Sequence, residues 1–181
     1  MKKTLIALGL AAAASTAHAL PDTGTILFTG KVNGNTCSIE IVDPYNGAVL
    51  NPIVLPEADA SQLSGAAGKD SAPLAFGLSI TAGTNCDTTG KKGVVSFSGK
   101  DGPAGAGDTL HALHTGSAAG VALAIKDNTG TLIPWGAESK EYDLNDTGES
   151  TMLFSANLRS TAATVSPGPV NATVPFVFDL K

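Results

Sequence analysis

The last strand-like segment of the chain, Val170–Leu180, constrains the fold more than any other feature of the sequence. Its alternate positions are all apolar: Val170, Ala172, Val174, Phe176, Phe178 and Leu180. A period of two residues indicates a β-strand with one face against a hydrophobic core. Such a strand must be covered, because an exposed apolar strand is a template for aggregation. The sequence therefore predicts a β-sheet protein in which something packs over this segment.

Short β-rich segments separated by turns continue through the rest of the chain. Gly supplies 21 and Pro 10 of the 181 residues, which disfavours long helices and favours turns. We expect a helical turn or two only within Ala58–Ala67, and the clearest hairpin at Val121–Trp135. The other expected strands are Thr25–Val32, Thr36–Val42, Ala48–Leu55, Leu74–Thr81, Gly93–Ser98 and Thr151–Arg159. Strands at this spacing predict a single all-β sandwich.

The first 19 residues have the pattern of a secretory signal peptide. Lys2 and Lys3 form a positive start, Leu5–Ala14 is an apolar run too short to span a membrane, and Ala17–Ala19 provides an A-x-A cleavage site. We therefore expect residues 1–19 to be removed and the remaining chain to be exported.

Export affects the expected redox state of Cys37 and Cys86, which are the only two cysteines in the chain. An oxidising compartment favours a disulfide between them. Two free buried thiols are the alternative. A zinc site is disfavoured, because neither cysteine has a histidine nearby in the sequence.

Residue patterns typical of catalytic or cofactor-binding sites are weak in this sequence. His111 and His114 lie in a loop rich in Gly and Ala, and we interpret them as solvent-exposed residues and not as metal ligands. The Gly-rich turn at 83–92 departs from a phosphate-binding loop because no Ser or Thr follows its lysine. The acidic residues at 143–149 are too few for a calcium loop. A net charge of −5 disfavours nucleic acid as a partner. The sequence predicts no enzyme and no cofactor.

Several elements follow the signal peptide in a fixed order. The pattern G-x-I-x-F-x-G-x-V occupies residues 24–32, and Cys37 follows five residues later. Cys86 comes after a further strand, the hairpin at Val121–Trp135 follows, and Gly168 is fourteenth from the C-terminus, just before the alternating strand. In this order the elements resemble the major pilin subunits, similar to those of type 1 fimbriae, that the chaperone–usher pathway of Gram-negative bacteria assembles.

The resemblance implies an incomplete immunoglobulin-like β-sandwich that is completed by a donor strand from another chain. A periplasmic chaperone supplies the strand first, and the N-terminal extension of the next subunit replaces it. Strand addition at a sheet edge is an established recognition mode, and pilin complementation is one of its known examples. The implied layout is a signal peptide at 1–19, a donor-strand extension at 20–30 and a pilin domain at 31–181.

The resemblance also implies partners and a location. The partners are identical or related pilin subunits, the periplasmic assembly chaperone and the outer-membrane usher. The location is a fimbrium on the cell surface, reached through the periplasm, and the function is structural and adhesive. One residue departs from the family pattern, because the penultimate tyrosine is here Leu180. Chaperone recognition is expected to differ in detail for that reason.

Two sets of residues carry assembly if the resemblance holds. The donor strand presents Gly24, Ile26 and Phe28, with Gly24 at a crowded site. We expect this segment to be unpaired in an isolated subunit; the alternative is that Thr25–Val32 is the first strand of the chain's own sheet. The acceptor groove and chaperone recognition are assigned to Gly168, Val170, Ala172, Val174, Phe176, Phe178 and Leu180.

Other function classes stay open from sequence alone. A minor adaptor or tip pilin shares the groove and the donor strand, so the same residues describe it. A secreted carbohydrate-binding β-sandwich usually needs clustered exposed aromatics, whereas Trp135, Tyr45 and Tyr142 are scattered. A small periplasmic enzyme is disfavoured by the absence of a recognisable catalytic triad or metal-binding pattern.

Overall fold

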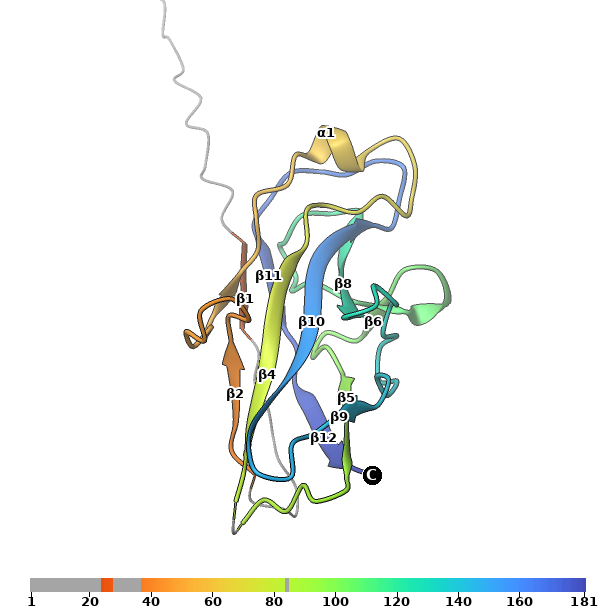
Figure 1. Ribbon diagram of the computed structural model, residues 1–181. Helices are drawn as coiled ribbons and strands as arrows, with labels where there is room; N and C mark the ends of the chain where they lie inside the picture. The colour runs from red at the N-terminus through yellow and green to blue at the C-terminus, as the bar shows by residue number, and fades with distance from the viewer. Residues whose placement is uncertain (1–23, 28–36, 84) are drawn as a thin grey trace, which may run out of the picture.

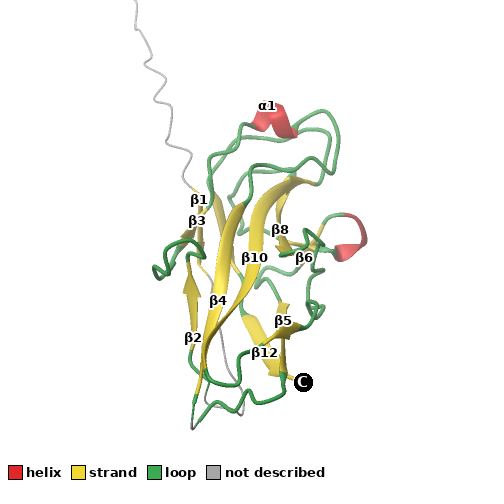
Figure 2. Ribbon diagram, viewed as in Figure 1, coloured by secondary structure: helices red, strands yellow, loops and turns green. Residues whose placement is uncertain are grey.

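The computed structural model describes residues 24–27, 37–83 and 85–181. Strands make up nearly all the regular structure, with one helical turn at the end of the molecule drawn uppermost (Figure 2). The helical turns are α1 (Ala60–Leu63) and η1 (Ala106–Asp108). The strands are β1 (Gly24–Leu27), β2 (Ile39–Val42), β3 (Ile53–Val54), β4 (Leu74–Ala82), β5 (Lys92–Phe97), β6 (Pro103–Ala104), β7 (Leu110–His111), β8 (Val121–Asp127), β9 (Tyr142–Asp143), β10 (Gly148–Ser160), β11 (Val170–Thr173) and β12 (Phe176–Leu180). The prediction of an all-β sandwich is confirmed.

The sheets pack as two layers around one core (Figure 1). One layer is a six-stranded sheet in the order β2-β4-β10-β8-β7-β6. The other contains the ladders β12-β5-β9 and β11-β1-β3. The longest ladder is antiparallel and joins β4 to β10 from Ala82 opposite Gly148 to Leu74 opposite Ala156. It forms the middle of the first layer.

Aromatic side chains fill the centre of the core. On β10, Met152 and Phe154 face inward, with exposed Thr151 and Leu153 alternating on the outer side. The rings of Phe154 and Phe76 stack with centroids 5.6 Å apart, and that of Phe97 meets Phe154 edge-on at 5.2 Å. Each such pair contributes about 0.5–1.5 kcal/mol beyond its buried area. The alternation of apolar residues thus determines which face of β10 is buried.

The disulfide predicted from the two cysteines is present. Cys37 and Cys86 are bonded with their Cα atoms 4.7 Å apart, and both are buried. Cys37 precedes β2, and Cys86 follows β4. Because β2 and β4 are paired neighbours, the bond joins two adjacent early strands at one end of the sandwich.

The hairpin predicted at Val121–Trp135 forms only in part. The turn is present, because the Asp127 carboxylate accepts hydrogen bonds from the backbone N–H groups of Thr129 and Thr131. The returning segment makes a single bridge, between Leu132 and Lys126, and is not a strand. Pro134 interrupts it, because proline has no N–H to donate to a ladder. The prediction of a second strand at Thr131–Trp135 is therefore wrong.

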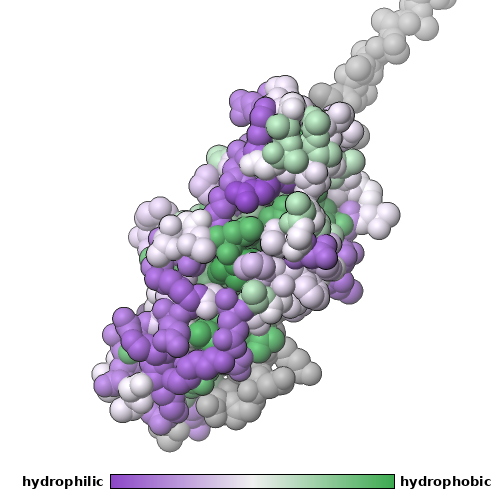
Figure 3. Space-filling model, turned by 90° about the vertical axis from the view of Figure 1, so that its right-hand side faces the viewer, coloured by the Kyte–Doolittle hydropathy of each residue, from purple (hydrophilic) through white to green (hydrophobic). Residues whose placement is uncertain are grey.

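The loop expected between residues 100 and 119 contains two short strands, β6 and β7, which extend the six-stranded sheet beyond β8. This places His111 opposite Leu123 of β8, with no exposed surface. The interpretation of His111 as a solvent-exposed loop residue is therefore wrong. A second, smaller apolar cluster of Leu110, Ala122 and Ala124 lies here. Seen from the right of Figure 1, the surface shows hydrophobic areas between polar ones (Figure 3).

Neither a membrane-spanning helix nor a metal-binding cluster occurs in the described ranges. No helix there is long and apolar enough to cross a membrane. No group of three or more His, Cys, Asp or Glu side chains in those ranges is arranged to hold a metal ion. The acidic side chains at 143–149 have separate partners: Asp143 pairs with Lys92, and Asp146 accepts from the backbone of Gly90.

Candidate strand-acceptor groove

The C-terminal segment is one long strand divided at Val174 and Pro175 into β11 and β12. Its alternate residues are buried, as their spacing predicts: Val170, Ala172, Val174, Phe176 and Phe178 are all at most 9% exposed, and Leu180 is partly buried. Val177, on the opposite face, is 42% exposed. The segment therefore presents one apolar face to the core along its whole length.

The two edges of β11 have different partners. On one edge, the backbone N–H groups of His114 and Lys100 donate to the carbonyl oxygens of Asn171 and Thr173, each at 2.8 Å. On the other edge, β11 pairs with β1. Loop residues thus hold β11 in place from one side, and the other side is a site for an added strand.

β12 continues this edge toward the C-terminus. It pairs with β5 on one side, from Phe176 opposite Phe97 to Leu180 opposite Gly93. Within the part of the chain that the structure describes, β12 is the outermost strand of its sheet. Its edge away from β5 lies on the same side of the segment as the β11 edge that β1 occupies, because the hydrogen bonds accepted by Thr173 and Pro175 are both on the opposite side. We call the space between this edge of β11 and β12 and the facing edge of β3 the acceptor groove.

The floor of the groove is closely packed under β12. Phe176 lies against Phe97 with ring centroids 6.4 Å apart. Gly93 leaves room for Phe178, because a Cβ atom on Gly93 would come within 2.9 Å of the Phe178 ring and 3.0 Å of the Met152 sulfur. A side chain at position 93 would therefore push Phe178 out of the floor.

A hollow of about 570 Å³ lies at the other end of the groove, beside α1. Its walls are mostly apolar and include Leu55, Leu63, Val121, Leu158, Val165 and Val170. Glu57, Asp59 and Gln62 line the same hollow. A space of this size can accept a large apolar side chain from a strand that extends beyond Val170.

Gly168 lies at the edge of this hollow and permits a close approach of two backbones. A Cβ atom there would come within 3.1 Å of the Ala118 nitrogen and 3.2 Å of its Cα. Next to it, the N–H of Ala118 donates to the carbonyl of Pro169 at 2.8 Å. The glycine thus allows β11 to begin close against the segment that leads into β8.

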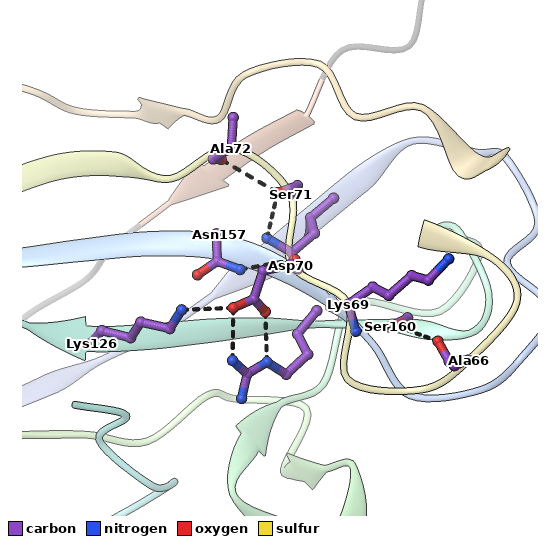
Figure 4. A network of polar contacts seen from close by, with 10 residues as sticks. Ala66, Lys69, Asp70, Ser71, Ala72, Lys126, Asn157 and Ser160 are labelled. Carbon is purple, nitrogen blue, oxygen red and sulfur yellow. Dashed lines mark hydrogen bonds and ion pairs between the residues drawn. The ribbon is translucent and has the colours of Figure 1, made fainter. Parts of the chain in front are cut away.

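The loop at 64–72, which follows α1, is fastened to the end of β10 by a polar network (Figure 4). The Arg159 guanidinium donates to both carboxylate oxygens of Asp70, at 2.6 and 2.7 Å, and Lys126 donates at 2.7 Å. These hydrogen bonds, that of Arg159 above all, hold the pKa of Asp70 well below its usual range. The network holds the loop after α1 to β10 and β8.

Two histidines lie behind β11, where sequence reasoning saw only a loop. The Nδ1 of His114 contacts the Asp101 carboxylate, and its Nε2 lies 3.0 Å from the Thr173 hydroxyl. His111 accepts a hydrogen bond from the Gly99 N–H at its Nδ1, and burial lowers its pKa to about 4. His114 thus links the loop to the edge of β11 away from the groove, whereas His111 links it to Gly99. No sequence pattern pointed to these roles.

The predicted donor residues are only partly within the described ranges. Phe28 lies outside them, as does the predicted signal peptide at 1–19. Gly24 and Ile26 belong to β1, which lies between β11 and β3 of its own chain. The segment is therefore not unpaired in this single chain, in contrast to our expectation. An open strand edge is readily filled by any extended segment within reach. The donor role of Gly24, Ile26 and Phe28 remains a prediction.

The arrangement binds a strand and carries out no chemistry that we can identify in the described residues. A groove with an open backbone edge and an apolar floor recognises an extended peptide by main-chain hydrogen bonds and by pockets for alternate side chains. These features define a strand-accepting β-sandwich.

Comparison with known proteins agrees with this geometry. The fimbrial protein family matches residues 26–181. A probable major fimbrial subunit, LpfA, of Escherichia coli is 36% identical over 97% of this chain and 95% of its own length. A type-1 fimbrial protein subunit of Serratia marcescens is 30% identical over the full length of both chains. The chain belongs to the fimbrial protein family.

Solved structures support the same fold. A Burkholderia pseudomallei antigen and type I fimbria protein is 29% identical, with a TM-score of 0.54, over 88% of this chain and 93% of its own. The P pilus rod subunit PapA has a TM-score of 0.56 over 80% of this chain and 99% of its own, at 24% identity. The protein is thus a structural subunit of surface fimbriae with an immunoglobulin-like fold, and it is not an enzyme.

Proposed function

We propose that the chain is a major, rod-forming pilin that polymerises by donor-strand exchange. Residues 20–30 of one subunit enter the acceptor groove of the next, and Gly24, Ile26 and Phe28 face the groove floor. A periplasmic chaperone occupies the groove first, and an outer-membrane usher is the site of exchange. The observation that carries the proposal is the continuous edge of β11 and β12, which already takes an extended strand at Gly24–Leu27.

The positions of donor and acceptor explain why such a contact makes a fibre. The donor segment is at the N-terminus and the groove edge is at the C-terminus of the same chain. A contact between unlike surfaces of identical subunits runs head to tail, and it extends without limit unless a rotation closes it. A filament is therefore the expected assembly. The relative named as a probable major fimbrial subunit matches nearly the whole chain and supports the major over the minor role.

The size of the assembled product tests the proposal. We expect ladders of multimers that survive mild SDS at room temperature and collapse to monomer on boiling, because each donor strand is held by a whole ladder of hydrogen bonds. Electron microscopy of cells that express the chain with its neighbouring assembly genes should show fibres. A monodisperse monomer under both conditions would contradict the proposal.

A further inference from the structure

His111 is a buried histidine that holds a neighbouring backbone segment by a hydrogen bond. The Gly99 N–H donates to its Nδ1 at 3.2 Å, and the side chain has no exposed surface. A neutral ring that accepts at Nδ1 carries its proton on Nε2. That nitrogen is buried and has no hydrogen-bond partner among the described residues. The ring is also closely packed, since a Cβ atom on Gly99 would come within 3.0 Å of the His111 Cβ.

The segment that His111 holds is bonded to the acceptor strand. Lys100, the residue after Gly99, donates its N–H to the carbonyl oxygen of Thr173 at 2.8 Å. The loop that continues from His111 is bonded to the same edge of β11, through the N–H of His114 at 2.8 Å. The contact between His111 and Gly99, which we call the clamp, thus joins two segments that support β11 on the side away from the groove.

Protonation of the His111 ring breaks the clamp. A proton on Nδ1 would point at the Gly99 N–H, so that two donors face each other, and it would add a charge to a buried site. Burial alone lowers the pKa of His111 from 6.5 to about 4. A ring that leaves its site recovers the higher pKa. Each pH unit between the two values therefore favours the open clamp about tenfold.

The described surroundings of His111 offer no charge that compensates for this proton. The residues paired opposite it, Pro103 of β6 and Leu123 of β8, carry none. The charged or titratable residues on the elements around His111 are exposed or have other partners: Lys100, Asp101, Asp108, His114, Lys126 and Asp127. Acid therefore acts on the clamp through His111 itself.

We propose that His111 is a positioning residue for the acceptor strand β11, and that its protonation in acid loosens β11 and speeds the release of a bound donor strand. The neutral ring keeps Gly99 in place, and with it the backbone bond of Lys100 to β11. A donor held by main-chain hydrogen bonds depends on an acceptor strand that stays in position. The inference rests on the proposed function, because the donor that it concerns is the strand of a neighbouring subunit.

Hydrogen exchange of the mature subunit measures the clamp directly. We expect the protection factors of the Gly99, Lys100 and His114 amides to fall about tenfold for each pH unit below 6.5. Amides of the β4–β10 ladder should remain better protected at every pH, which separates opening of the clamp from unfolding of the sandwich. Trp135, the only tryptophan in the chain, donates from Nε1 to the Gly99 carbonyl at 3.1 Å, so its fluorescence should change over the same pH range.

Two variants separate His111 from general effects of acid. His111→Asn keeps an acceptor near the position of Nδ1 but cannot titrate, so its protection factors should change by less than about threefold between pH 6.5 and pH 4.5. The matched control, His114→Gln, removes the other histidine of this loop and should keep the full pH dependence. Multimer ladders of the unmodified chain and of His114→Gln should shorten at least tenfold faster at pH 4.5 than at pH 6.5, and those of His111→Asn should not.

The outcomes distinguish the clamp from the function beneath it. Unchanged protection of Gly99 and Lys100 in acid, or an equal fall in His111→Asn, overturns the clamp and leaves the acceptor groove standing. Ladders of the unmodified chain that shorten equally fast at both pH values overturn the release of the donor. Failure of the unmodified chain to form ladders at pH 6.5 overturns the proposed function and donor release together, and this result is distinct because exchange in a single subunit requires no assembly.

A measurement on the unmodified chain decides the case if His111→Asn does not fold. The ring ¹⁵N resonances of His111 report which nitrogen carries the proton. The clamp requires a neutral ring with its proton on Nε2 at pH 6.5. A proton on Nδ1 at that pH overturns the proposal.

Discussion

Phe176→Asp places a carboxylate in the floor of the acceptor groove. The side chain is 5% exposed and lies against Phe97, so loss of the ring removes about 2–3 kcal/mol of hydrophobic stabilisation. An unpaired carboxylate without water adds several kcal/mol more, which the group relieves by taking up a proton at a raised pKa. The total approaches the whole free energy of unfolding of a domain, about 5–15 kcal/mol.

The neighbouring residue provides a matched control. Val177 follows in the same strand, but it faces outward and is 42% exposed, so Val177→Asp should cost about 1 kcal/mol or less. A second control, Phe76→Ala, removes a fully buried ring from the core, and Phe76 does not lie on the groove edge. It should cost about 3–5 kcal/mol.

The assay is co-expression with the assembly chaperone, with recovery of the complex measured per molecule of folded subunit. We expect Phe176→Asp to abolish recovery, Phe76→Ala to lower the folded yield but keep the ratio, and Val177→Asp to change neither. Destabilisation by Phe176→Asp should also be smaller at pH 5 than at pH 8, because the raised pKa favours the neutral acid. Normal chaperone recovery with Phe176→Asp, or equal damage by Val177→Asp, would refute the assignment of this face.

Three further changes test other parts of the molecule. Replacing Cys37 and Cys86 by Ser should lower the free energy of unfolding by about 4 kcal/mol, since the bond closes a loop over a sequence separation of 49 residues; an unchanged urea midpoint would argue against this. His111 has a pKa of about 4 in the folded chain against 6.5 when unfolded, so the unfolded state binds more protons between these values. Stability should therefore fall as the pH drops from 6.5 to 4, and His111→Leu should flatten that dependence in urea titrations; an equally steep fall in the variant would show that other groups cause it. Gly24→Arg should leave folding and chaperone capture intact but stop polymerisation, if Gly24 enters a crowded pocket of a neighbour; ladders of normal length from this variant would remove Gly24 from the donor strand.

Local sequence patterns predicted most of the strands. Leu74–Thr81 and Thr151–Arg159 became the long β4–β10 ladder, because residues that alternate along an extended strand are buried or exposed by the same period. The prediction of a strand at Thr131–Trp135 was wrong, because Pro134 prevents a ladder even though the turn before it forms. β6 and β7 were missed, because strands of two residues are too short to carry a periodic signal.

The sequence predicted which alternate side chains of the candidate groove are buried, but it did not predict the shape of the groove. The spacing of apolar residues in Val170–Leu180 indicated which side chains are buried, and the structure buries them. It did not indicate the division at Pro175, the hollow beside α1, or the buried His111 behind β11. Those features arise where distant segments meet, so no short window of sequence contains them.

The sequence by itself determined the all-β class, the only available disulfide pair and the apolar face of the last strand. These follow from the conformational preferences and the chemistry of individual residues, which act over a few positions. Only the tertiary structure decided that β12 is the outermost strand of its sheet in the described chain, and that β1 lies parallel to β11 and antiparallel to β3. The physical reason is that a strand edge is open or filled according to which distant strand reaches it, and that choice depends on the packing of the whole sandwich.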